Sequence, residues 1–112
     1  MPHCIIEYSN DLETRNKISK TVKVVNQELI NSELFDNTTI KTRALPIKEY
    51  LVGGKKTSFI HTTIKSLQGR TDSQKKILSN KILNVLSVEY TFVKNISVEI
   101  IDINPNTYSK KQ

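Results

Sequence analysis

A proline next to the N-terminus is the first residue in this sequence whose type and position could support catalysis. Pro2 follows Met1, and removal of Met1 would leave a secondary amine at the start of the chain. An ordinary α-amine has a pKa of about 8, and burial or a neighbouring cation lowers that pKa because both disfavour the protonated form. A neutral amine near pH 7 is a competent general base. Pro2 is therefore a candidate catalytic base, and the alternative is that it only stiffens the terminus.

Two arginines are candidates for binding an anionic substrate beside such a base. Arg43 lies in a β-rich run, and Arg70 lies at the predicted start of a helix. The guanidinium group is planar and always charged, so it can bind a carboxylate through paired hydrogen bonds. A helix start favours anions as well. The alternative for each arginine is an ordinary surface position.

His61 and Cys4 are the remaining side chains with chemical potential. His61 falls in the middle of a β-rich run, where we expect a packed, hydrogen-bonded core histidine, with a contact to substrate as the alternative. Cys4 is expected to be a small buried filler. A single cysteine excludes an internal disulfide and a four-cysteine metal site. The sequence contains no phosphate loop, dinucleotide fingerprint or zinc spacing, so we expect no metal site.

The net charge of +6, from 17 basic and 11 acidic residues, suits either small carboxylates or nucleic acid as partners. The basic residues are scattered rather than gathered in one block, which is typical of a solvated surface. A basic RNA-binding module is the non-enzymatic alternative. Such modules stack bases on aromatic side chains, and the chain has only three Phe and four Tyr. We therefore expect a small anionic carboxylate substrate and no nucleic-acid partner.

The cysteine content and the apolar stretches bear on the compartment. One unpaired cysteine fits a reduced, cytoplasmic compartment. The first residues do not form a basic start followed by an apolar core, so we expect no signal peptide. The longest uncharged stretches are far shorter than a membrane span, and we expect no membrane partner.

The order of elements predicts two similar halves. Apolar residues at helical spacing predict two helices, and β-branched runs predict four strands. The helix stripes are Ile18, Val22, Val25 and Leu29, then Leu78, Ile82, Val85 and Leu86, with Val93 as a further candidate beyond the second; the strands are 3–8, 39–47, 57–66 and 96–103. Ser9, Asn10 and Asp11 are candidate N-caps for the first helix, and Gly53-Gly54 predicts a turn between the halves.

Each half, about 2–50 and 55–105, has the length of one βαβ unit. We predict a single domain over 1–112, of the α+β class (an α/β two-layer arrangement). Its tandem βαβ units form a four-stranded mixed sheet with two helices on one face. Apolar residues occur at both strand parities, as in Ile5-Ile6 and Ile100-Ile101, which predicts burial of both sheet faces. Two helices cover one face, so we expect an oligomer to cover the other.

Several segments in order resemble the 5-carboxymethyl-2-hydroxymuconate isomerases of the tautomerase superfamily. The segments that carry the resemblance are 2–9, 40–43, 59–65, 69–71 and 104–108, and 69–75 is also similar to a segment of the short 4-oxalocrotonate tautomerases. The resemblance implies a tautomerase-like homotrimer with sites near subunit boundaries. It also implies an enzyme that needs no cofactor and acts in the breakdown of aromatic compounds.

The resemblance implies a role for each candidate residue. Pro2 would act as the general base, moving a proton from the enol oxygen of a 2-hydroxymuconate-type substrate to carbon. Arg43 and Arg70 would hold carboxylates and polarise the 2-oxo group, and His61 matches a substrate-contact position. The alternative within the same fold is a tautomerase of other enol acids, such as phenylpyruvate.

Overall fold

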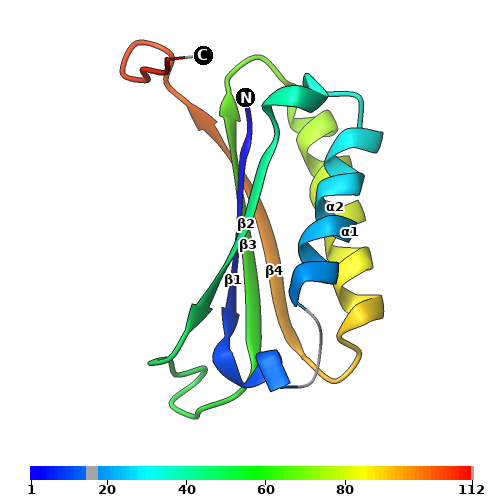
Figure 1. The fold of residues 1–112 in the computed structure, drawn as a ribbon, viewed down its shortest axis with the longest axis vertical. Coiled ribbons are helices and arrows are strands. Elements are labelled where there is room, and N and C mark those ends of the chain that lie inside the picture. Colours follow the sequence, from blue (N-terminus) through cyan, green and yellow to red (C-terminus); the bar gives the residue numbers. More distant parts are fainter. Residues whose placement is uncertain (15–17, 112) are drawn as a thin grey trace.

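The computed structural model describes residues 1–14 and 18–111. Four strands form one sheet, and two α-helices lie side by side across one of its faces (Figure 1). The elements are β1 (His3–Ser9), η1 (Asn10–Thr14), α1 (Ile18–Asn31), η2 (Asn37–Thr39), β2 (Lys41–Ile47), β3 (Phe59–Leu67), α2 (Asp72–Glu89) and β4 (Asn95–Ile103), where η marks a short 3₁₀-helix. Within residues 1–14 and 18–111, no helix is long and apolar enough to cross a membrane.

The sheet has the order β2-β1-β3-β4 and is mixed. β1 and β2 run parallel and are joined by α1, and β3 and β4 run parallel and are joined by α2. The two βαβ units meet along an antiparallel pairing of β1 with β3. The predicted four-stranded mixed sheet with two helices on one face is therefore confirmed. One consequence matters for the site: the N-terminus and the segment after β4 lie at the same end of the sheet (Figure 1).

The hydrophobic core fills the layer between the sheet and the helices. Even-numbered positions of β1 and β3 point into it, because side chains alternate between the faces of a strand. The helix stripes predicted from the sequence supply much of the other side, although Ile18 and Val22 are only partly buried and Val85 is half-buried. The buried apolar residues are Cys4, Ile6, Tyr8, Leu12, Val25, Leu29, Phe35, Ile60, Ile64, Leu78, Ile82, Leu86, Tyr90 and Val93.

The connection after β1 differs from the prediction. Ser9 is the last residue of β1 rather than a helix cap, and its buried hydroxyl accepts a hydrogen bond from the Phe59 amide at 3.1 Å. A 3₁₀-helix follows at Asn10–Thr14, residues 15–17 lie outside the described residues, and α1 begins at Ile18. The turn predicted at Gly53-Gly54 is confirmed, since both glycines have positive φ and Val52 pairs with Lys55 across them.

The sheet face opposite the helices is open in the single chain. Ile6 on the helix side is 2% exposed, whereas Ile101 on the open side is 41% exposed and Ile5 is half-buried. Burial of both faces is therefore not achieved by one chain. The apolar residues of odd-numbered strand positions remain available to a partner.

The two isoleucines of α2 allow a matched test of this packing. We expect Ile82→Ala, at a fully buried position, to lower the free energy of unfolding by about 2–5 kcal/mol, because it leaves a cavity between α2 and the sheet. Ile77 lies on the same helix but is 55% exposed, and we expect Ile77→Ala to change stability by no more than about 0.5 kcal/mol. Urea unfolding of both variants measures the difference, and equal effects would contradict the assigned helix face.

Candidate active site

Pro2 lies immediately before β1 and is fully buried, although it is next to the end of the chain. Its carbonyl accepts a hydrogen bond from the Lys41 amide at 3.0 Å, which extends the parallel pairing of β1 with β2. The preceding Met1 amine donates to the hydroxyl of Thr39. The first two residues are thus tied to the start of β2 and to η2, which precedes it.

A cavity of about 300 Å³ opens at this end of the molecule. It carries two cations, Arg70 and Lys110, and one carboxylate, Asp36. Residues from four separate parts of the chain line it: Met1, Phe35, Asp36, Thr39, Ser66, Leu67, Arg70 and Lys110. The terminal residue and a predicted anion-binding arginine therefore share one small, positively charged cavity.

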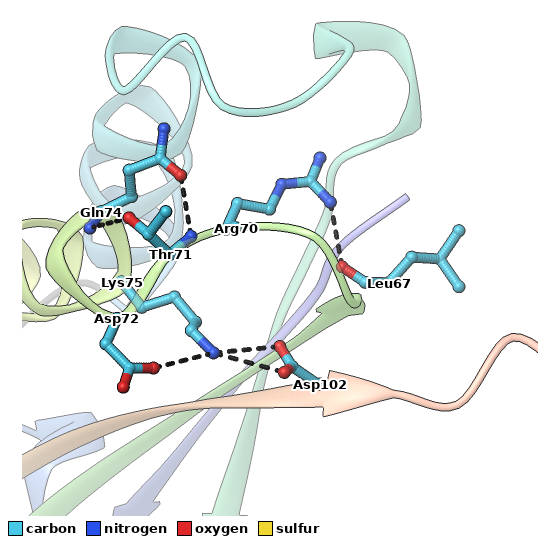
Figure 2. A network of polar contacts seen from close by, with 7 residues as sticks. All are labelled: Leu67, Arg70, Thr71, Asp72, Gln74, Lys75 and Asp102. Carbon is cyan, nitrogen blue, oxygen red and sulfur yellow. Dashed lines mark hydrogen bonds and ion pairs between the residues drawn. The ribbon is translucent and has the colours of Figure 1, made fainter.

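Arg70 is held by its surroundings rather than projecting freely into solvent. Its Nη1 donates to the Leu67 carbonyl at 3.0 Å, a bond visible in Figure 2, and its Nη2 donates to the Leu34 carbonyl at 2.7 Å. The guanidinium also lies over the Phe35 ring, 4.9 Å from its centroid. The two bonds use two N–H groups, and an arginine has five. The remaining donors suit a carboxylate in a preset orientation.

The start of α2 fixes the backbone that carries Arg70. Thr71 is the N-cap: its hydroxyl accepts from the Gln74 amide at 3.1 Å while the Gln74 side chain accepts from the Thr71 amide at 2.9 Å (Figure 2). This reciprocal pair is a capping box, which satisfies two amides of the first turn. Lys75 extends from the same turn to Asp102 of β4 at 3.3 Å. Arg70 therefore precedes a helix start that is tied to the sheet.

Arg43 reaches the terminus indirectly. It lies on β2, opposite Ile5 of β1, with an exposed side chain whose Nη1 is 3.2 Å from Nδ1 of His3. The other ring nitrogen of His3 is 3.0 Å from the Tyr108 hydroxyl, which donates to the Met1 sulfur at 2.9 Å. Sequence reasoning did not single out His3 or Tyr108. The available signal was that both fall inside segments that carry the family resemblance.

The electrostatic environment favours neutral forms of the amine and of the imidazole. Burial lowers the pKa of the Met1 amine below its usual value of 8.0, and the charges of Lys41, Lys110 and Arg70 lower it further. Asp36 acts in the opposite direction. The pKa of His3 is lowered from 6.5 by burial first and then by nearby cations, led by Arg43. An amine in this position is therefore less basic than a solvated one.

His61 lies away from the cavity at the N-terminus. It is opposite Glu7 in the pairing of β1 with β3, whereas His3, next to the terminus, is opposite Lys65. Its odd-numbered position faces away from the helices, so the prediction that His61 is a packed core residue is wrong. His61 instead contacts the Ser97 hydroxyl at 2.6 Å and Glu99 at 3.1 Å on the open face. Within one chain it does not join the cavity, and contact with substrate stays a prediction.

Cys4 is confirmed as a buried filler. It is fully buried among apolar neighbours, and burial raises the pKa of its thiol to about 12. A thiol with such a pKa is protonated and unreactive at neutral pH. Within residues 1–14 and 18–111, no group of three or more His, Cys, Asp or Glu side chains is arranged to hold a metal ion.

Comparison with known proteins identifies the family. The family model described as 5-carboxymethyl-2-hydroxymuconate isomerase matches residues 2–112. The chain belongs to this family. As a member of the 5-carboxymethyl-2-hydroxymuconate isomerases it is an enzyme, an isomerase, and the expectation raised by the sequence segments is confirmed. No curated protein sequence matches it.

Solved structures agree on the fold of this isomerase. A 5-carboxymethyl-2-hydroxymuconate isomerase from Deinococcus radiodurans R1 is 24% identical, with a TM-score of 0.87 over 99% of this chain and 89% of that one. A fused 4-OT wild type, solved as a symmetric trimer, is 16% identical, with a TM-score of 0.80 over 98% and 93%. A macrophage migration inhibitory factor-like protein from Entamoeba histolytica is 18% identical, with a TM-score of 0.77 over 99% and 96%.

Proposed function

We propose that this isomerase is a cofactor-independent keto–enol tautomerase whose general base is the amine of Pro2, exposed when Met1 is removed. The substrate is 5-carboxymethyl-2-hydroxymuconate or a similar unsaturated 2-hydroxy or 2-oxo carboxylate. The observation that carries the proposal is the position of the terminus in a cavity with Arg70 and Lys110. The family match, which begins at Pro2, supports it.

The local environment supports the role of the amine. The pKa of the Met1 amine is lowered by burial and by Lys41, Lys110 and Arg70. Pro2 follows Met1 directly, and its carbonyl is bonded to the Lys41 amide, so we expect the same cations to lower the pKa of its amine after trimming. A base whose pKa lies near the working pH is largely neutral and yet basic enough to accept a proton.

The proposed reaction needs no second reactant. The Pro2 nitrogen accepts the proton of the enol hydroxyl, and the electron pair of that O–H bond becomes part of the new carbonyl. The conjugated double bonds shift by one position, and the same nitrogen returns the proton to carbon. The product is an isomer of the substrate, so atoms and electrons balance within one molecule.

The two arginines bind the anionic groups of the substrate. Arg70 is anchored by the carbonyls of Leu34 and Leu67, so its remaining N–H groups offer a prepositioned site for a carboxylate. Arg43 supplies a second cation on the far side of His3. Fixed cations also stabilise the charge that develops on oxygen as the enol loses its proton.

The proposed assembly is a homotrimer that covers the open face of the sheet. Leu45 of β2 and Ile101 of β4 are 45% and 41% exposed there, at the two edges of the sheet. Exposed apolar side chains on one sheet face are typical of an interface. A fused 4-OT protein of the same fold has been solved as a symmetric trimer. In such an assembly a neighbouring copy would complete the cavity.

Pro2→Ala tests the proposed base. We expect it to lower kcat/KM for a 2-hydroxymuconate-type dienol by about 10²-fold, because the trimmed variant carries a primary amine without the ring that fixes the position of the nitrogen. Protein that retains Met1 should be inactive, because Pro2 is then an amide without a basic nitrogen. Absorbance of the dienol measures turnover, and mass spectrometry identifies the trimmed form.

The matched control for this test is Pro46→Ala. Pro46 is opposite Tyr8, at the other end of β1 from the terminus, and the variant should retain normal activity. Full activity of Pro2→Ala, or full activity of protein that still carries Met1, would contradict the proposed base.

Lys110→Gln tests the electrostatic part of the proposal. Lys110 lowers the pKa of the Met1 amine, and we expect the same effect on the Pro2 amine, so removal of its charge raises that pKa and leaves less neutral base at a given pH. We expect the acid limb of the kcat/KM profile to move to higher pH. Lys111→Gln is the control, because Lys111 is exposed and does not line the cavity. An unshifted profile in Lys110→Gln, or equal shifts in both variants, would count against the account.

A further inference from the structure

A line of hydrogen bonds leads from Arg43 through His3 and Tyr108 to Met1, and its direction can be assigned. A guanidinium group only donates, so Nδ1 of His3 must accept from Arg43. A neutral imidazole then carries its single proton on Nε2 and donates it to the Tyr108 oxygen. Because the Tyr108 oxygen accepts from His3, the Tyr108 hydroxyl donates its own proton to the Met1 sulfur.

His3 has the protonation state that this direction requires. Its pKa is lowered from 6.5 by burial, and by the charges of Arg43, Lys41, the N-terminus and Lys65. The imidazole is therefore neutral at physiological pH, with Nδ1 unprotonated. The line is thus a fixed one-way arrangement: each donor has one acceptor, and the last O–H points at Met1.

Removal of Met1 takes away the acceptor at the end of this line of hydrogen bonds. Met1 is the acceptor for the Tyr108 hydroxyl, and its amine is bound to the hydroxyl of Thr39. Without Met1, the Tyr108 hydroxyl needs another acceptor. A half-buried donor of this kind gains from pairing with an acceptor. The anionic carboxylate that the site's cations attract is an acceptor of the right charge.

We propose that Tyr108 contacts the substrate, donating its hydroxyl to a carboxylate oxygen, and that His3 is the positioning residue that holds Tyr108 for this contact. The proposal rests on the proposed function, because it requires removal of Met1. The contact strengthens binding of the substrate carboxylate and takes no part in the proton transfer. In the untrimmed chain, the Met1 sulfur takes the place of that carboxylate oxygen as the acceptor for Tyr108.

The test compares single variants of the trimmed, full-length protein. Tyr108→Phe removes one hydroxyl, and a hydrogen bond to a charged group contributes enough for its loss to raise KM by about tenfold to a hundredfold. We expect kcat to change by less than about threefold, since Tyr108 takes no part in the proton transfer. Tyr50→Phe is the control, because Tyr50 bonds Asp11 beyond the other end of β1.

Variants of His3 separate positioning from a general structural role. His3→Leu should raise KM as Tyr108→Phe does, and the double variant should be no worse than either single one, because both changes remove the same contact. His3→Gln keeps an amide N–H donor and should restore part of the loss. Additive effects of His3→Leu and Tyr108→Phe would overturn the positioning role.

Calorimetric binding of muconate, a dicarboxylate that lacks the enol hydroxyl, keeps this inference separate from the proposed function. We expect Tyr108→Phe to weaken binding at least tenfold, even if no dienol is turned over and the proposed chemistry fails. If Pro2→Ala abolishes activity while Tyr108→Phe matches the wild type in KM and in muconate affinity, the proposed function stands and this inference is overturned. Should His3→Leu fail to fold, Tyr108→Phe alone decides the substrate contact, and additive effects of His3→Gln and Tyr108→Phe would overturn the positioning role.

Discussion

The hydrogen bond from the Lys41 amide to the Pro2 carbonyl extends the parallel pairing of β1 and β2 to the end of the chain. A terminal segment is normally poorly ordered unless it is tied down. Here the first strand is a central strand of the sheet, so its start is held from both sides. This placement turns an ordinary N-terminus into a fixed group in a cavity, and the chemistry proposed for Pro2 depends on it.

The rest of the fold gathers positive charge around that fixed point. The loop after β3 brings Arg70, the strand β2 brings Lys41, and the segment after β4 brings Lys110. Each belongs to a different part of the chain, and each disfavours a proton on the terminal amine. In the proposed function the same charges attract an anionic substrate. One arrangement would then serve two needs, a less basic amine and a site for carboxylates.

Short-range patterns in the sequence were sufficient for the architecture. The helix stripe around Val25 and Leu29 and the order of the β-rich runs predicted two βαβ units, because burial of an apolar face follows local periodicity. The residue types of Pro2, Arg43 and Arg70 indicated the chemistry, and the roles given to them remain proposals.

The long-range contacts could not be predicted from the sequence. Arg70 is anchored to the carbonyl of Leu34, 36 residues away, and His3 meets Tyr108 across 105 residues. A single sequence carries no signal for such partners. The face on which His61 lies depends on strand parity: Phe59 and Ile60 are both apolar, so the apolar pattern did not show which of the two points inward. The register of the folded sheet settled that question and moved His61 from the expected core to the open face.

The pKa of the Pro2 amine in the trimmed protein is the quantity that tests the central claim most directly. It can be measured by following the ¹⁵N resonance of Pro2 through a pH titration. We expect a pKa below the ordinary value of an N-terminal proline amine, coinciding with the acid limb of the kcat/KM profile. A pKa at or above the ordinary value, or one that does not coincide with that limb, would contradict it.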